Sequence, residues 1–160
     1  MSQIDSIFAI TAIDGRYRSK VENLAHITSE FGLLKYRTEV ECQWVLFLSE
    51  CAEVPEIPSL DEEDRAFVAA IAGNFDAVGA ARIKAIEATT NHDVKAVEYY
   101  LKEQFALRPN LQAINEWVHF GCTSEDINNT AYGLMVKAGV EDVLLLHMDQ
   151  LIKVIDDLAQ

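Results

Sequence analysis

The strongest constraint on the fold of this chain is a long apolar repeat in the segment 124–160. Apolar residues recur there in steps of four and three positions, which places them along one face of an α-helix. The repeat consists of Ile127, Ala131, Leu134, Ala138, Glu141, Leu145, Met148, Ile152, Ile155 and Ala159, with Glu141 as its one polar member. This spacing is typical of the seam between helices in a bundle.

A helix over 124–160 would be longer than the rest of the chain is wide. At 1.5 Å per residue it would extend about 55 Å, whereas the preceding residues should form a body about 35 Å across. The pattern also runs to Gln160 without the Gly, Asn or Pro that usually closes a helix. We therefore expect a truncated piece of a longer protein; the alternative is a natural C-terminal helix that frays.

The rest of the chain also has helical periodicity, so we predict an all-α fold. Residues 1 to about 20 are expected to be irregular, and Ser59 and Glu62 have the spacing of a capping box. Asp93 is expected to cap a fourth helix, and Arg37 to lie at the edge of the apolar stripe of the first. The predicted helices cover 33–51, 59–72, 76–88, 93–105, 111–120 and 124–160.

The acidic composition argues against several classes of partner. The chain has 26 Asp and Glu against 13 Lys and Arg, a net charge of −13, so its field repels nucleic acids and anionic membranes. No apolar run is long enough to span a membrane. Three cysteines without metal-ligand spacing are typical of free thiols in the reducing cytosol, so we expect a cytoplasmic protein with no metal site. The acidic run Asp61–Asp64 is interpreted as a solvated first turn.

Three short polar clusters are the candidate functional segments. They are Asp14–Tyr17, Thr89–Asp93 and Thr123–Asn129, in the irregular N-terminus or at predicted helix starts. Free backbone N–H groups and the positive end of the helix dipole bind carboxylates and phosphates at such starts. His92 is the preferred histidine, because the other three, His26, His119 and His147, lie within predicted helical stretches.

Each cluster also has a purely structural interpretation. Asp14–Tyr17 fits a turn with a solvated Arg16, and a lone histidine is more often structural than catalytic. Thr123 with Asp126, or Ser124 alone, fits a cap of the long helix. The pair Asn128–Asn129 is harder to explain in this way, because Asn is unfavourable inside a helix unless its amide has a partner.

Taken together and in this order, the clusters resemble the bacterial adenylosuccinate lyase family, a branch of the fumarase and aspartase superfamily of helical lyases. The residues that carry the resemblance are Asp14-Gly15-Arg16-Tyr17, Thr89-Thr90-Asn91-His92-Asp93-Val94-Lys95-Ala96-Val97-Glu98-Tyr99 and His119-Phe120-Gly121-Cys122-Thr123-Ser124-Glu125-Asp126-Ile127-Asn128-Asn129. The resemblance spans nearly the whole chain and corresponds to the N-terminal part of the family.

The resemblance implies an enzyme of purine biosynthesis that eliminates fumarate from adenylosuccinate, giving AMP, and from the succinylated aminoimidazole carboxamide ribotide. It implies no metal and no organic cofactor. The substrate-binding residues would be Arg16, Tyr17, Asn91, His92, Asp93, Thr123 and Ser124. The first two would hold the phosphate of the purine nucleotide, the next three would form a second binding segment, and the last two would bind a succinyl carboxylate.

The chain departs from the family in the catalytic residues themselves. The family's general acid is a His in a Thr-His-Gly-Gln-type segment and its general base a Ser in a flexible Ser-Ser-x-Met-Pro-x-Lys-x-Asn-Pro loop, and neither occurs here. The resemblance therefore implies an N-terminal helical domain over 1–110 and the start of a central helical-bundle domain over 111–160. We expect no lyase activity from the chain alone, with at most an assisting role for His92.

The family is a homotetramer whose central helices bundle, which agrees with the long seam and predicts self-association. Two other interpretations remain open. The first is a different lyase of the superfamily, acting on argininosuccinate, fumarate or aspartate, although Arg16-Tyr17 and Asn91-His92-Asp93 favour a nucleotide substrate. The second is a non-catalytic helical interaction module, which explains the seam but not the three ordered clusters.

Overall fold

The computed structural model describes residues 6–160, and over that range the regular structure is helical without any β-strand. The predicted all-α fold is therefore confirmed. The irregular N-terminus is confirmed for residues 6–20, where short 3₁₀ turns at Ser6–Phe8 and Arg18–Lys20 are joined by bends. Residues 1–5, which belong to the same prediction, lie outside the described residues. A further 3₁₀ turn, Glu22–Leu24, leads into the short helix α1, Ala25–Thr28.

Helix α2, Glu30–Leu48, lies at the centre of the molecule and is buried on more than one face. Its first turn is capped by Ser29, whose side chain accepts a hydrogen bond from the Gly32 N–H at 3.4 Å. The helix ends before the predicted Cys51, because the Ser49 hydroxyl donates to the Leu46 carbonyl at 2.7 Å and the chain turns there. The prediction that Arg37 lies at the edge of an apolar stripe is wrong. Helices pack on several sides of α2, and Arg37 is only 4% exposed.

Helix α3, Glu62–Gly73, begins later than the predicted capping box at Ser59. The cap is Asp61, whose Oδ1 accepts a hydrogen bond from the Asp64 N–H at 2.8 Å. Ile57 and Leu60 are buried on either side of Pro58, so the chain stays extended over the core until Asp61. The predicted capping box of Ser59 and Glu62 is therefore wrong, because the loop before Asp61 is held against the core.

The interpretation of the run Asp61–Asp64 as a solvated turn is also wrong for one member. Asp64 is 1% exposed, and its carboxylate contacts the Arg108 guanidinium and the Asn110 amide. These contacts join the first turn of α3 to the start of α6, Pro109–Ala113. The other carboxylates of the run remain on the surface.

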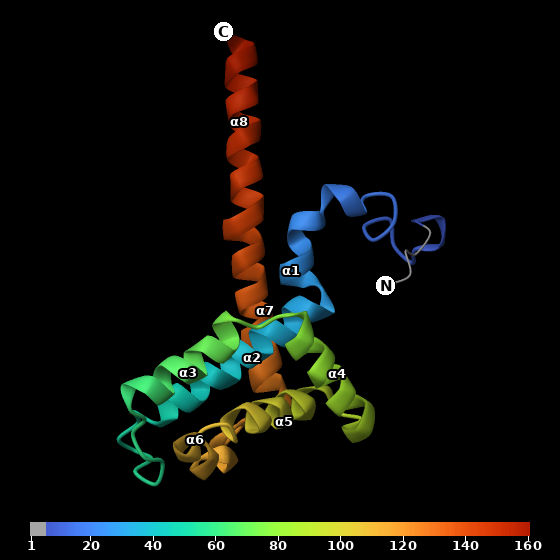
Figure 1. Cartoon of the computed structure of the whole chain (residues 1–160). Coiled ribbons are helices and arrows are strands. Elements are labelled where there is room, and N and C mark those ends of the chain that lie inside the picture. The colour runs from blue at the N-terminus through green and yellow to red at the C-terminus, as the bar shows by residue number, and fades with distance from the viewer. Residues whose placement is uncertain (1–5) are drawn as a thin grey trace.

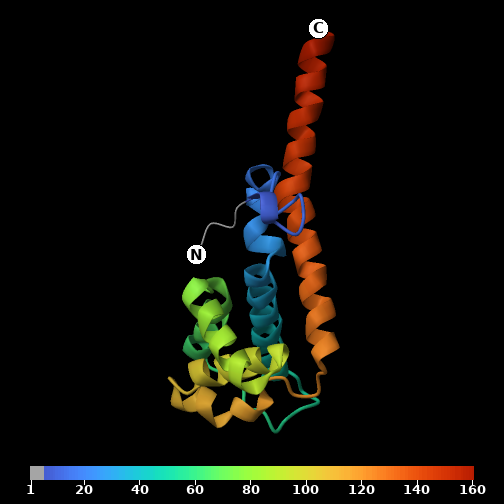
Figure 2. The same ribbon diagram turned by 90° about the vertical axis from the view of Figure 1, so that its right-hand side faces the viewer.

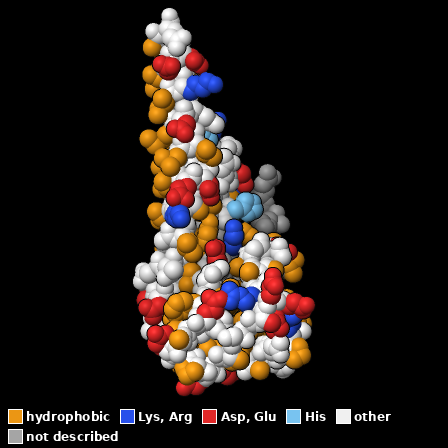
Figure 3. All heavy atoms as spheres, turned by 90° about the vertical axis from the view of Figure 1, so that its left-hand side faces the viewer, with side chains coloured by type: hydrophobic (Ala, Val, Ile, Leu, Met, Phe, Trp, Pro, Cys, Tyr) orange, Lys and Arg blue, Asp and Glu red, His pale blue; other side chains and the backbone are white. Residues whose placement is uncertain are grey.

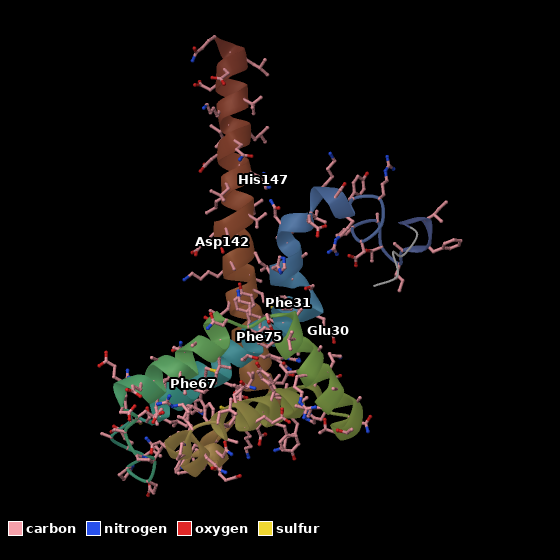
Figure 4. All side chains as sticks on the ribbon, viewed as in Figure 1. Glu30, Phe31, Phe67, Phe75, Asp142 and His147 are labelled. Atoms are coloured by element: carbon pink, nitrogen blue, oxygen red, sulfur yellow. The ribbon has the colours of Figure 1, made fainter. Side chains whose placement is uncertain are left out.

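Helices α4, Ala77–Thr90, and α5, Asp93–Phe105, form an angled pair below α2 (Figure 1). The side chain of Asp76 caps α4 by accepting from the N–H groups of Val78 and Gly79. Gly79 lets α4 approach closely, since a Cβ there would lie 2.9 Å from the Tyr100 hydroxyl of α5. Phe31 and Phe75 pack together where α2 and α4 begin, with ring centroids 5.6 Å apart (Figure 4).

The predicted helix over 111–120 is shorter than expected and broken. Pro109 begins α6 instead of interrupting a helix, because proline lacks only an N–H that is unpaired in the first turn anyway. A separate 3₁₀ turn follows at Asn115–Trp117. Buried Leu111, Ile114 and Val118 hold this segment against the core, and the chain then turns toward α7.

Two apolar clusters hold the helices together. The larger one lies between α2, α3, α4, α5 and α6, and its fully buried members include Cys42, Val45, Val68, Leu101 and Phe105. The smaller one joins α1 and α2 to the long C-terminal helix through Ile27, Tyr36, Ala131 and Met135. Figure 2 shows α2 between the α3–α5 layer and the long helix.

The C-terminal segment forms one continuous rod that extends well beyond the body (Figure 1). It consists of α7, Ser124–Ala138, a π-helical segment, Gly139–Leu144, and α8, Leu145–Ala159. The wider π turn shifts the register, so Val143 packs on the smaller cluster while Glu141 is exposed. This shift accounts for the single polar member of the repeat.

No residue of α8 is buried, and hydrophobic side chains follow the rod to its C-terminal end (Figure 3). No single helix within residues 6–160 has the length and apolar content needed to cross a membrane. Only α3 and α4 taken as a pair meet those criteria, and the two are bent by 85° relative to each other.

Candidate functional site

Two of the three polar clusters lie side by side, at the start of α5 and the start of α7. The link between them is Arg37 of α2. Its Nε donates to the Asn128 Oδ1 at 2.9 Å, and its Nη2 donates to the Asp93 Oδ2 at 2.7 Å. The Thr89–Asp93 and Thr123–Asn129 clusters therefore form one site, which we call the α5/α7 site.

The segment Asn91-His92-Asp93 is a tight connection between two helices. Asn91 ends α4 in the left-handed conformation, with φ 51°, and its N–H donates to the Glu87 carbonyl at 2.8 Å. His92 is the N-cap of α5, because its Nδ1 accepts a hydrogen bond from the Lys95 N–H at 3.1 Å. The predicted cap at Asp93 is wrong: Asp93 is the first helical residue, since the imidazole already occupies the capping position.

The geometry of this cap decides the protonation pattern of His92. An Nδ1 that accepts a hydrogen bond carries no proton, so the neutral ring carries its proton on Nε2. The side chain is 52% exposed. The His92 ring therefore presents an Nε2–H donor toward solvent, where a ligand oxygen can accept it.

The Asp93 carboxylate is held in its ionised form. Burial alone would raise its pKa. The hydrogen bond from the Val94 N–H and the charge of the Arg37 guanidinium have a larger opposite effect, so the pKa of Asp93 is below its usual value. The side chain is still 50% exposed. Asp93 thus combines a fixed position with access to solvent.

The start of α7 has the cap predicted from Thr123 and Asp126. The Asp126 carboxylate accepts hydrogen bonds from the Thr123 N–H at 2.7 Å and from its hydroxyl at 2.8 Å. These bonds lower the pKa of Asp126. Both polar hydrogens of Thr123 are therefore directed at Asp126, and the hydroxyl of the half-buried Ser124 is the side-chain donor next to them.

The third cluster lies elsewhere. Arg16 and Tyr17 are exposed and contact each other, with the guanidinium carbon 5.3 Å from the ring centroid. The N-terminal segment that holds them lies on the far side of α1 from the rod, near the level of His147, whereas α5 lies at the opposite end of the body (Figures 1 and 4). The structure does not bring Arg16 and Tyr17 to the α5/α7 site.

Sequence reasoning missed a buried ionisable pair close to α7. Glu41 of α2 is fully buried, and its carboxylate lies 2.5 Å from the His119 Nδ1 and accepts from the His119 N–H at 3.1 Å. Burial raises the pKa of Glu41, and the His119 contacts offset this only in part. His119 lies in a turn with φ 63°, outside the helix that was predicted to contain it.

A signal for this pair was present in the sequence. Arg37 and Glu41 are spaced by four residues, in line with the buried Leu34, Val45 and Leu48 of the same helix. Charged residues at such positions are rarely buried unless they are paired. This spacing indicated two buried polar contacts, although not their partners.

A groove of about 590 Å³ lies between α2 and α7 beside the α5/α7 site. It is lined mainly by apolar groups such as Trp44, Ile127 and Leu134, together with the carboxylates of Glu39 and Asp126. No Lys, Arg or His occurs among its described lining residues. The groove is therefore unsuited to anchor an anion. No group of three His, Cys, Asp or Glu side chains suited to a metal ion occurs within residues 6–160.

Comparison with known proteins gives a consistent result. A family described as "Lyase" matches residues 15–160 of this chain. An adenylosuccinate lyase of Vibrio cholerae is 51% identical over 158 residues, which is 99% of this chain and 35% of that protein.

Two further relatives carry the same name. The adenylosuccinate lyase of Escherichia coli K12 is 48% identical over 98% of this chain and 34% of its own length. That of Haemophilus influenzae is 45% identical over 99% of this chain and 35% of its own length. The chain thus spans about a third of the length of these relatives and corresponds to their N-terminal portion.

Proposed function

The chain belongs to the lyase family, and from this premise we propose that it is the N-terminal portion of an adenylosuccinate lyase. The reaction would eliminate fumarate from adenylosuccinate to give AMP, and from the succinylated aminoimidazole carboxamide ribotide earlier in purine biosynthesis. The observation that carries this proposal is identity of 45–51% to proteins of that name over nearly the whole chain. The α5/α7 site adds a chemical reason for it.

The proposed role of the α5/α7 site is to bind the substrate. Two helix N-termini meet there, and the positive end of each helix dipole favours an anion. Ser124 would bind a succinyl carboxylate together with Thr123, whose hydroxyl must first leave Asp126. His92 would donate from Nε2, and Asn91 and Asp93 would contact polar groups of the substrate.

Arg16 and Tyr17 would hold the phosphate, since a guanidinium and a phenol are suitable donors. Their separation from the α5/α7 site means that one copy of this chain does not form a complete site in this structure. A site shared between copies would resolve this, and it agrees with the apolar stripe on α8. We propose a homotetramer for the full-length protein, in the cytoplasm and without a cofactor.

The elimination requires two proton transfers. A base removes a proton from the carbon next to a carboxylate, the C–N bond breaks, and an acid protonates the leaving nitrogen. The family's Ser and His segments for these steps have no counterpart in this sequence. We propose that the present residues bind and orient the substrate, and that the chain alone releases no fumarate.

The test is a chimera in which this chain replaces the corresponding N-terminal third of the Escherichia coli relative. We expect it to release fumarate and AMP from adenylosuccinate, whereas the 160-residue chain should release none above a no-protein control. The control for assembly is light scattering beside the unaltered relative. A chimera of the same mass that leaves adenylosuccinate intact would contradict the proposed function.

Two alternatives predict different results. A different fumarate-releasing lyase would make the chimera prefer argininosuccinate, aspartate or malate as the fumarate precursor. A non-catalytic interaction module would keep its partner binding when Arg16 or His92 is substituted. The proposed enzyme would lose substrate affinity or rate with those substitutions.

A further inference from the structure

We propose that Arg37 is the positioning residue that fixes the two binding segments of the α5/α7 site relative to each other. This inference rests on the proposed function for its effect on the reaction, but its structural part does not. Arg37 is on α2 and bonds Asp93, the first residue of α5, and Asn128 of α7. It acts through the side chains of Asp93 and Asn128.

Arg37 has the geometry of a bridge. Separate nitrogens of the guanidinium bind the Asp93 carboxylate at 2.7 Å and the Asn128 amide oxygen at 2.9 Å. Within residues 6–160 it is the only side chain with hydrogen bonds to both segments. Because the Arg37 guanidinium is planar and rigid, Asp93 and Asn128 cannot move independently of each other.

The bridge extends one residue further at the start of α7. The Asn128 Nδ2 donates to the Glu125 Oε1 at 3.0 Å, so both ends of the amide are engaged and its orientation is fixed. Asn128 lies one helical turn after Ser124, and Asp93 is adjacent to His92. A displacement of either partner would therefore change the distance between the ligand-binding groups at the two helix starts.

Burial makes this arrangement specific to arginine. The Arg37 side chain is 5% exposed, whereas that of Asp93 is 50% exposed, so the bridge is anchored in the protein and presents its far side to solvent. A lysine at this position would place one ammonium group where the guanidinium bridges two side chains. Burying an imperfectly paired ammonium is unfavourable. This also explains one of the two adjacent asparagines, because the Asn128 carbonyl oxygen has a partner inside the helix in Arg37.

The test compares Arg37→Lys with Arg108→Lys as a matched control. Arg108 also pairs with a buried aspartate, Asp64, but joins α3 to the start of α6 away from the site. In the 160-residue chain, NMR would follow the Asn128 side-chain amide on introducing Asp93→Asn. We expect a clear shift in the wild-type background and in Arg108→Lys, and none in Arg37→Lys, because the bridge that couples the two is gone.

The effect on the reaction is measured in the chimera. Arg37→Lys should raise KM for adenylosuccinate by about tenfold or more with a smaller change in kcat, while Arg108→Lys leaves both within about twofold. If the chimera is inactive, the proposed function fails and the NMR coupling still tests the bridge.

Two results would overturn the proposal. One is an Asn128 side-chain amide signal that does not shift when Asp93→Asn is introduced into the wild-type chain. This measurement does not depend on any Arg37 variant folding. The other is an active chimera in which Arg37→Lys and Arg108→Lys have the same KM.

Discussion

His92 caps a helix and is also proposed to bind substrate, and the two ring nitrogens divide these tasks. Nδ1 accepts the Lys95 N–H, whereas Nε2 faces away from the helix. A substitution that removes the whole ring confuses the two tasks. A residue that caps equally well but lacks Nε2 separates them.

We therefore predict different outcomes for His92→Asn and His92→Ala. Asparagine is among the best N-caps, so the free energy of unfolding of His92→Asn should lie within about 0.5 kcal/mol of the wild-type value. That of His92→Ala should be lower by about 1 kcal/mol. Urea unfolding of the 160-residue chain measures both. Fumarate release by the chimera should fall in both variants; retained activity in His92→Asn would leave the histidine with capping alone.

The buried Glu41 should make the free energy of unfolding depend on pH. Burial raises its pKa above the usual 4.5 in spite of the contacts with His119. Between 4.5 and the raised value, the folded chain binds a proton that the unfolded chain has released. The free energy of unfolding should therefore decrease as pH rises through this window.

The variant Glu41→Gln cannot titrate, so this part of the decrease should disappear. It should also be less stable overall, by about 1–3 kcal/mol, because an amide has one oxygen in place of the two carboxyl oxygens that contact the His119 backbone N–H and Nδ1. Urea unfolding between pH 4.5 and 7 checks both points, with the exposed Glu141→Gln as control. An unchanged pH slope in Glu41→Gln would show that another group titrates.

At the scale of elements, helix boundaries depend on which residue is free to turn back onto the first N–H groups. Asp76, Ser29 and Thr123 lie where the chain leaves the core, and each caps the helix that follows it. Ser59 has the right chemistry but lies in a loop held extended by Ile57 and Leu60. Where a side chain caps a helix, the path of the preceding loop therefore decides which residue does so.

This difference predicts unequal effects at two neighbouring positions. Asp61→Ala removes the acceptor for the Asp64 N–H and should lower the free energy of unfolding by about 1 kcal/mol. Ser59→Ala should change it by less than about 0.5 kcal/mol, because Ser59 caps nothing. Chemical denaturation monitored by circular dichroism compares them. Equal losses would mean that Ser59 contributes to the start of α3 after all.

At the scale of the whole molecule, a well-packed body carries a rod whose C-terminal part, α8, has no buried residue. Leu151 and Ile155 are 59% and 57% exposed, on the same face of α8. An apolar stripe of this length is unfavourable in water and favours association with another apolar surface. We expect the chain to self-associate through it.

The predicted result is a mass that rises with concentration in light scattering after size-exclusion chromatography. The double variant Leu151→Gln/Ile155→Gln should weaken association at least about tenfold, since two buried leucine-sized side chains contribute several kcal/mol. Lys153→Gln/Asp157→Asn leaves the net charge and the stripe unchanged and serves as control. A wild-type chain that stays monomeric at high concentration would contradict the exposed-seam interpretation.

The sequence by itself determined the all-α fold, most helix positions and the family. Apolar spacing of three and four residues is a local property, so it survives without knowledge of the fold. The cap at Thr123 follows for the same reason, since it involves a residue only three positions away. The order of the three polar clusters along the chain indicated the family without knowledge of which clusters lie together.

Only the tertiary structure decided which charged residues are buried and which segments share a site. Arg37 meets Asp93 and Asn128 at separations of 56 and 91 residues, and Glu41 meets His119 at 78. No periodic pattern within one helix contains such partners. A buried charge is stable only when the fold supplies its counterpart, so its role is set by packing and not by the local sequence.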